Sequence, residues 1–359
     1  MKNKKLLIWG GILLIMVLLI KVYSASPSRV ESNYSNGLYP PFASFLRYLL
    51  GWLPFSLGDI LYGAVFIWLI WKLIMVTRAL FKKQVNGKFF IRGSLKTAIA
   101  FLMIYVFFNV FWGINYNRQG IAEQLQLKME KYSLQDLKKI NELLFTKVNV
   151  AKQSLVDHNS HYPSSKKLFV KVQDAYTGLD SQYPYLKYQP LSLKPSLWGW
   201  LGNYLGFTGY YNPFTGEAQV NTMVPEFLQP FICCHEVAHQ LGYAKEMEAN
   251  FVGYLAASSS RDTLLQYSVY LELFLYSNRN LYTSDSTAAK LFAKQLIPAV
   301  KNDIAEWRDF SRRHRNIVEP LIRWLYGKFL ENNQQPQGVL SYDEVTSFLI
   351  AYYKKFGKI

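Results

Sequence analysis

The chain has 359 residues, of which 50% are hydrophobic, 16% aromatic and only 18% charged. It is richer in apolar residues than an ordinary soluble protein, so we expect part of it to lie in lipid. The formal net charge of +16 does not indicate nucleic-acid binding, because residues 1–115 hold 13 Lys and Arg against 2 acids, whereas residues 116–359 hold 27 against 22. No strongly basic domain therefore remains for a nucleic-acid partner.

Three apolar runs predict transmembrane helices at about residues 6–23, 57–77 and 95–115. Each run covers, or nearly covers, the roughly 20 helical residues that the hydrocarbon core of a bilayer requires. The first run, "LLIWGGILLIMVLLI", is alternatively a cleaved signal peptide, since "YSASPS" at residues 23–28 offers small residues for processing. Residues 1–115 are thus predicted to be a multi-pass membrane region.

The distribution of Lys and Arg predicts the orientation. The loop between the second and third runs carries six basic residues and no acid over residues 78–96, and lysines also precede the first run. Basic loops stay on the cytoplasmic side. We therefore expect a cytoplasmic N-terminus in the cell membrane and an extracytoplasmic domain formed by residues 116–359.

The domain is predicted to be mainly α with a small β element. Helical periodicity extends over residues 119–157, where Ser133 and Asp136 form a candidate capping box, and over 165–179. Prolines indicate a loop at 181–196, and "GEAQVNT" at 216–222 favours a short strand. Further helices are expected at about 226–240, 244–259, 262–278, 286–313 and 316–331.

The segment "HEVAH" carries the clearest chemistry. His235 and His239 are four residues apart, so on a helix they share one face and can present two imidazoles to one metal ion. Glu236 points to the neighbouring flank, where it can act as a general base without being a ligand. Gly242 then offers a helix stop in the left-handed conformation.

A second helix follows at once with "AKEMEANFVGYLAA". Glu246 and Asn250 fall on one face of it, as a third ligand and a residue that orients a histidine would. Glu248 lies on another side of the helix and is the less favoured third ligand. The adjacent cysteines Cys233 and Cys234 are interpreted as small buried residues, because neighbouring cysteines rarely form a disulfide and the chain has no others.

These motifs resemble the gluzincin branch of zinc metallopeptidases, in which HExxH and a downstream Glu-x-x-Ala-Asn motif bind zinc. The resemblance implies a zincin-like domain with Zn²⁺ ligands at His235, His239 and Glu246 and a general base at Glu236. The whole chain also resembles an uncharacterised family of bacterial membrane-anchored, zincin-like proteins. Two features depart from the pattern: Glu246 follows His239 by only seven positions, and Lys245 stands where metzincins place a third histidine.

Enzymes of this kind also need a strand that pairs with the peptide and a group that stabilises the oxyanion. The resemblance assigns the strand to Gly216, Glu217 and Ala218, in the only candidate segment. The oxyanion partner stays open among several residues, which are Tyr254, Tyr211, His314, Tyr210 and Tyr243.

The leading interpretation is a membrane-anchored zinc metallopeptidase that hydrolyses a peptide or protein substrate outside the cytoplasm, with the lipid bilayer as its other partner. The alternative is a non-catalytic membrane sensor or assembly protein with a structural zinc site, in which Glu248 or a cysteine completes the coordination. A third hypothesis, in which the helix binds no metal, makes "EMEAN" a coincidence.

Overall fold

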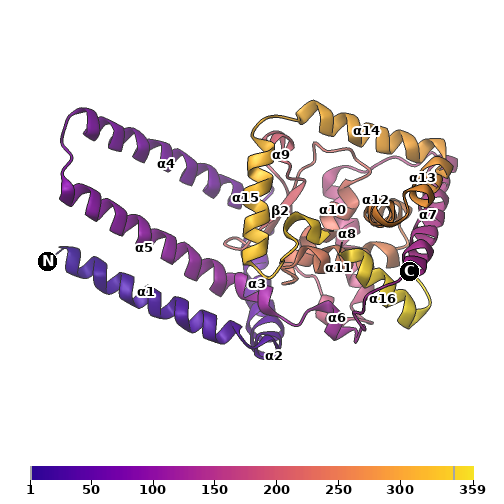
Figure 1. Ribbon diagram of the computed structural model, residues 1–359, viewed down its shortest axis with the longest axis horizontal. Helices are drawn as coiled ribbons and strands as arrows, with labels where there is room; N and C mark the ends of the chain where they lie inside the picture. The colour runs from indigo at the N-terminus through magenta and orange to yellow at the C-terminus, as the bar shows by residue number, and fades with distance from the viewer. Residues whose placement is uncertain (1, 343) are drawn as a thin grey trace.

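The computed structural model describes residues 2–342 and 344–359. The protein is 73% helical with 3% strand, which confirms the mainly α class. Two parts are visible in Figure 1: a set of long N-terminal helices and a rounded helical domain at one end of them.

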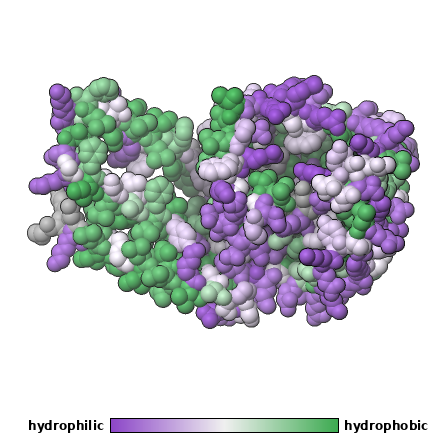
Figure 2. Space-filling view, in the orientation of Figure 1, coloured by the Kyte–Doolittle hydropathy of each residue, from purple (hydrophilic) through white to green (hydrophobic). Residues whose placement is uncertain are grey.

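Three helices are long and apolar enough to cross a membrane, as predicted: α1 (Lys2–Ser24), α4 (Leu57–Phe81) and α5 (Gly87–Phe111). The third begins eight residues before its predicted start, because the Asn86 side chain caps the helix by accepting from the Phe89 amide. In Figure 2 these helices are largely green, whereas the surface of the domain is largely purple. The N-terminus and the α4–α5 loop lie at the end far from the domain (Figure 1).

The segment between the first two spans packs under the domain. It forms α2 (Pro27–Arg29), a π-helix η1 (Val30–Leu38) and α3 (Tyr39–Leu50). Glu31 of η1 makes a buried ion pair with Arg118, at 2.7 Å between Oε1 and Nη2. The segment between the first two spans is therefore part of the support of the domain.

The predicted helix over 119–157 is wrong in its first third. The chain forms a 3-10 turn η2 (Gly113–Asn117) and the short α6 (Ile121–Gln124), and only then α7 (Leu134–Asp157). The cause is Gly120, whose φ of 87° no regular helix accommodates. The capping box of Ser133 and Asp136 at the start of α7 is confirmed.

The domain contains a three-stranded sheet, in the order β1–β3–β2. It contains β1 (Leu193–Pro195), β2 (Gly209–Asn212) and β3 (Glu217–Val220). The expected strand thus exists as β3, but it pairs parallel with β1 and antiparallel with β2. Because both of its edges are paired, β3 has no free edge for a peptide.

Helices make up the rest of the domain. The first group is α8 (Ser165–Leu179), η3 (Pro184–Leu186), α9 (Gly199–Leu205), α10 (Gln229–Gln240) and α11 (Glu246–Ser259). The second is α12 (Thr263–Ser284), α13 (Ser286–Gln295), α14 (Pro298–His314), α15 (Glu319–Asn332), η4 (Gly338–Tyr342) and α16 (Val345–Phe356). The single helix predicted over 286–313 is split at Ile297, because a residue before proline avoids the helical conformation.

The core positions α10 at the centre of the domain. Helix α12 packs along α7, while α10 contacts α11, α12 and the sheet. Every residue of α10 is buried. A charged or polar group on this helix therefore needs a partner within the protein or a bound ion.

Candidate metal centre

Helix α10 carries the two histidines, and a tight turn brings α11 back against it. Gly242 ends α10 with φ of 87°, in the left-handed conformation expected there. Gly253 of α11 then faces the first histidine so closely that a Cβ there would lie 3.1 Å from the His235 amide nitrogen. The turn sets Glu246, the first residue of α11, opposite the Nε2 atoms of both imidazoles.

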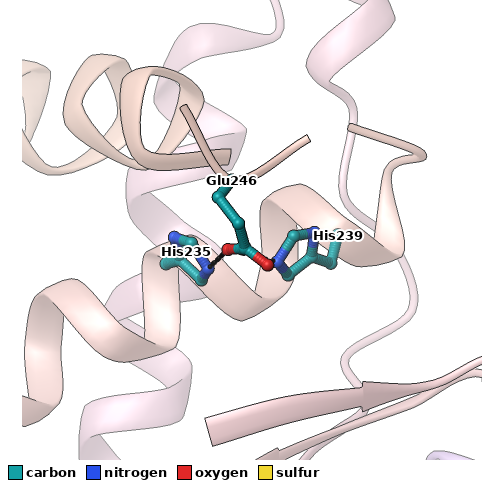
Figure 3. Close-up of side chains that lie close together, drawn as sticks. All are labelled: His235, His239 and Glu246. Atoms are coloured by element: carbon teal, nitrogen blue, oxygen red, sulfur yellow. Dashed lines mark ion pairs between the residues drawn. The ribbon is translucent and has the colours of Figure 1, made fainter. Parts of the chain in front are cut away.

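The side chains of His235, His239 and Glu246 converge on one point (Figure 3). Glu246 Oε2 lies 3.2 Å from His235 Nε2 and 3.5 Å from His239 Nε2. All three side chains are buried. The three ligand atoms lie within 4.8 Å of one another, which makes this group able to hold a metal ion.

The donor set and its spacing fit a tetrahedral metal ion. Bonds of about 2.0–2.1 Å to imidazole nitrogen and carboxylate oxygen place neighbouring ligand atoms about 3.3 Å apart in a tetrahedron. The separations of 3.2 and 3.5 Å between Glu246 Oε2 and the two Nε2 atoms lie on either side of that value. Glu246 Oε2 also accepts no hydrogen bond from any described residue. A cation between the three side chains would satisfy this buried oxygen.

A second layer of groups fixes the orientation of both imidazoles. His235 Nδ1 lies 2.8 Å from Asn250 Oδ1, and His239 Nδ1 lies 2.8 Å from the Tyr243 carbonyl oxygen. Because each partner is an acceptor, each Nδ1 carries the proton and donates it. Both Nε2 atoms are then left with a lone pair for a metal ion.

Glu246 is held by two residues from the C-terminal part of the chain. Tyr326 of α15 donates its hydroxyl to Glu246 Oε1 at 2.6 Å, and Gln335 Oε1 accepts from the Glu246 amide at 2.8 Å. Neither residue is predictable from the sequence, because neither belongs to a recognisable pattern around the motif.

Glu236 lies on the flank of α10 that faces β2. A Cβ at Gly209 would be 2.5 Å from Glu236 Oε1, so only glycine leaves room for this carboxylate. Burial raises the pKa of Glu236 to about 7, against an opposing effect of the two imidazoles. Its Oε2 is buried and has no hydrogen-bond partner among the described residues. These properties suit a group that exchanges a proton near neutral pH.

The electrostatics of the three converging side chains are those of an ion pair. Burial alone would raise the pKa of Glu246, but the nearby His239 and His235 outweigh it and hold the pKa well below the usual value. Burial would likewise lower the pKa of His239, yet Glu246 raises it to about 9. The site thus attracts positive charge, carried either by protons on the imidazoles or by a metal ion.

Glu248 points away from this group, to the opposite side of the α10–α11 turn. Its Oε1 lies 3.6 Å from Lys245 Nζ, and a Cβ at Gly120 would be 2.1 Å from it. Burial raises the pKa of Glu248. The structure therefore brings Glu246, and not Glu248, to the two histidines.

The residues considered for the oxyanion have other surroundings. Tyr254 packs in the core against Phe251 and Tyr352, and the ring of His314 lies between Tyr204 and Phe310. The other hydroxyls already have partners: Tyr211 with Tyr39, Tyr210 with Asp59 and Ser196, and Tyr243 with Gln124. The hydroxyl that reaches the group is that of Tyr326.

The expected substrate strand has a structural role instead. The carboxylate of Glu217 accepts the amides of Leu57 and Gly58 at 3.1 and 2.7 Å, and so caps the first turn of α4. Ala218 is fully buried. This corrects the assignment of Gly216, Glu217 and Ala218, which lie in and before the central strand of the sheet.

Cys233 and Cys234 are free and fully buried, and burial raises the pKa of both thiols. Raised pKa values keep them protonated and unreactive. They are packing residues of α10.

The fold and the site together define a class: a mainly helical protein with three apolar helices able to cross a membrane and, among its described residues, a buried His-His-Glu group that can bind a metal ion. A family model described as "Protein of unknown function (DUF3810)" matches residues 34–350. The match covers most of the chain, so the protein belongs to this family. No curated protein and no solved structure matches it.

Proposed function

We propose that the protein is a membrane-anchored, zinc-dependent metallopeptidase. The observation that carries this proposal is the convergence of His235, His239 and Glu246, with the buried carboxylate of Glu236 beside them on the same helix. Two imidazoles and one carboxylate are a ligand set typical of catalytic zinc sites.

The number of ligands favours an enzyme over a structural zinc protein. A structural site needs a fourth protein ligand, whereas a catalytic site keeps one position for water or substrate. Among the described residues the metal-ligating group has three members, and Glu248 and the cysteines point elsewhere. The geometry therefore supports a site with an open position.

The protein's own groups would carry the proton transfers of hydrolysis. When bound, Zn²⁺ would supply Lewis-acid chemistry, which acidifies water and polarises a carbonyl group. Glu236 accepts the proton of the attacking water and returns it to the leaving amine, a task matched by its pKa of about 7. Tyr326 and Asn250 hold the ligands in position.

Strand β2 is the best candidate for contact with a peptide backbone. It lies at the edge of the sheet, and its Gly209 touches Glu236. Thr208 and Tyr210 lie at hydrogen-bonded positions toward β3, so the backbone groups of Gly209 and Tyr211 face the free edge. An extended substrate would add to this edge by β-augmentation.

The proposed site lies outside the cytoplasm. The domain is at the end of the spans opposite the basic α4–α5 loop and the N-terminal lysines (Figure 1). If basic loops stay inside, the domain is extracytoplasmic.

The test is hydrolysis of a quenched-fluorescent peptide of mixed sequence by the full chain, purified in detergent with zinc. We expect Glu236→Gln to reduce the rate by about 10²–10⁴-fold, as for loss of a general base, while the bound zinc is retained. The fully exposed side of α14 offers a matched control, Glu306→Gln, which should keep the rate. Equal rates for Glu236→Gln and the wild type would refute the proposed function.

A further inference from the structure

Helix α15 and the residues before it carry a row of exposed apolar side chains. Ile317 is 95% exposed and Trp324 is 58% exposed. The full set is Ile317, Val318, Leu321, Trp324, Leu325 and Phe329. Within α15 they recur at helical spacing, so they form one stripe along the helix. Monomeric soluble proteins rarely leave such a stripe in water.

The opposite side of α15 faces the metal centre. Gly327 and Leu330 are buried there, and Tyr326 donates to Glu246. A helix with its side chains is about 10 Å across. The exposed stripe and the metal-ligating group thus lie on two sides of a single helix.

One end of α15 contacts the span α5, and the other end contacts α9, which lies beside the span α4. At its C-terminal end the ring of Phe329 lies 6.2 Å from that of Phe108, in the last turn of α5. Near its N-terminal end Asn316 donates to the Tyr204 carbonyl oxygen of α9 at 2.6 Å. Figure 1 shows α15 running across the direction of the spans, between them and the rest of the domain.

The segment around α9 touches the first two turns of α4. Trp198 donates to the Asp59 carbonyl oxygen at 3.1 Å, and a Cβ at Gly63 would lie 2.9 Å from its ring. The nearby Trp200 and Tyr204 are exposed. Tryptophan and tyrosine concentrate at the boundary between membrane and water. Since α4 is one of the apolar helices, these rings mark where that boundary meets the domain.

Helix α4 makes few contacts with the other two spans. None of its most apolar window is buried by the described protein, whereas α1 packs along α5. In a membrane, lipid therefore surrounds this window of α4. On the domain side, α15 contacts α5 directly and α4 through α9.

We propose that α15 lies in the bilayer interface on the domain side, with its apolar stripe among the lipid chains, and that the metal centre acts on peptide segments anchored in the bilayer. The occupant of the stripe is lipid because Phe329 joins the stripe to α5 at Phe108, and the exposed apolar surface of α5 already requires lipid. Lys328 on the same side forms an exposed ion pair with Glu331 at 2.6 Å, and such charged side chains suit the headgroup region. The substrate class rests on the proposed function, whereas the position of α15 does not.

Spin-label accessibility in lipid vesicles tests the position of α15. Leu325→Cys is labelled with a nitroxide, and Asp309→Cys on exposed α14 is the matched control; the two native cysteines are fully buried and unreactive. We expect the ratio of collisions with oxygen to collisions with a water-soluble nickel chelate to be several-fold higher at position 325 than at position 309. Equal ratios would mean that water or another protein covers the stripe, and would overturn the position.

Hydrolysis in the same vesicles tests the substrate class. The mixed-sequence peptide is offered free and with a palmitoyl chain, at equal total concentration. We expect several-fold faster hydrolysis of the palmitoylated form and loss of that advantage in Leu321→Lys/Leu325→Lys, with the free peptide hydrolysed as before. Equal rates for both peptides, or an advantage that survives the double substitution, would overturn the substrate class. Hydrolysis of neither peptide would refute the proposed function, while the label ratios would still decide where α15 lies.

Discussion

The α10–α11 turn has a buried carboxylate on each of its two faces, Glu31 on the outer face and Glu246 on the inner face. The two carboxylates differ in the hydrogen bonds that they accept. On the outer face, both oxygens of Glu31 accept from Arg118, with further donors from Gly120 and Gln124. On the inner face, Glu246 Oε1 accepts from Tyr326, whereas Oε2 faces only the two imidazoles and accepts no hydrogen bond from the described residues.

The difference separates a structural role from a chemical one. The guanidinium of Arg118 donates four hydrogen bonds, which hold the outer face together and leave no coordination position. The inner face has an anionic oxygen with lone pairs directed at one point. Arg118 also donates to the Gly242 carbonyl oxygen at 3.2 Å, so the outer face holds the turn that positions Glu246. The Arg118–Glu31 ion pair therefore supports the metal centre without contributing a ligand to it.

The largest expected effect is a loss of stability when the Arg118–Glu31 ion pair of the outer face is removed. Arg118→Met leaves the buried Glu31 without its counter-ion, which should lower the free energy of unfolding by about 3–5 kcal/mol. Urea titration of the full chain in detergent measures it. Lys139→Met, which removes a cation from an exposed pair, is the control and should cost about 1 kcal/mol or less. A loss at Arg118 as small as at Lys139 would contradict a structural role for the outer face.

A smaller effect is expected from the second layer of the inner face. Asn250→Ala removes the acceptor that orients His235, and loss of such a partner weakens metal binding by about 10–100-fold. Competition with a zinc chelator measures the affinity. Asn302→Ala on exposed α14 should leave it unchanged. Unaltered affinity in Asn250→Ala would mean that His235 does not bind the metal through Nε2.

Tyr326→Phe should weaken zinc binding by at least about tenfold, because a hydrogen bond to a charged group contributes about 1.5–3 kcal/mol. The same chelator competition applies, with Tyr282→Phe, which is exposed, as control. Since only one hydroxyl is removed, the fold should remain. An effect no larger than that of Tyr282→Phe would show that α15 does not position Glu246.

The smallest effect is a dependence on acid. Burial alone would raise the pKa of Glu31, but Arg118 outweighs it and holds the pKa below 4.5. A depressed carboxyl pKa stabilises the fold above about 4.5, and this contribution is lost as the pH falls through the folded-state value. As the pH falls below 4.5, the midpoint of unfolding of the wild type should therefore decrease more steeply than that of Glu31→Gln. Parallel curves would show that Glu31 does not contribute to the pH dependence of stability.

The sequence predicted what depends on local spacing. The histidine pair, the stop at Gly242 and the start of α11 are encoded within one short stretch, and so is the capping box of α7. Tyr326 and Gln335 come from 80 and 89 residues beyond Glu246, where no spacing rule connects them to the site. The strand order could not be predicted either, since a single apolar run does not reveal whether one or both edges of the strand are paired. The break at Ile297, in contrast, was readable from Pro298.

The zinc content of a matched pair of variants shows whether Glu246 completes a zinc site with His235 and His239. Glu246→Gln and Glu248→Gln remove buried carboxylates two residues apart, from the inner and the outer side of the turn. After purification of the full chain without chelator, elemental analysis should find about one zinc per chain in the wild type and in Glu248→Gln, and almost none in Glu246→Gln. Equal zinc in both variants, or a wild type without zinc, would contradict the account.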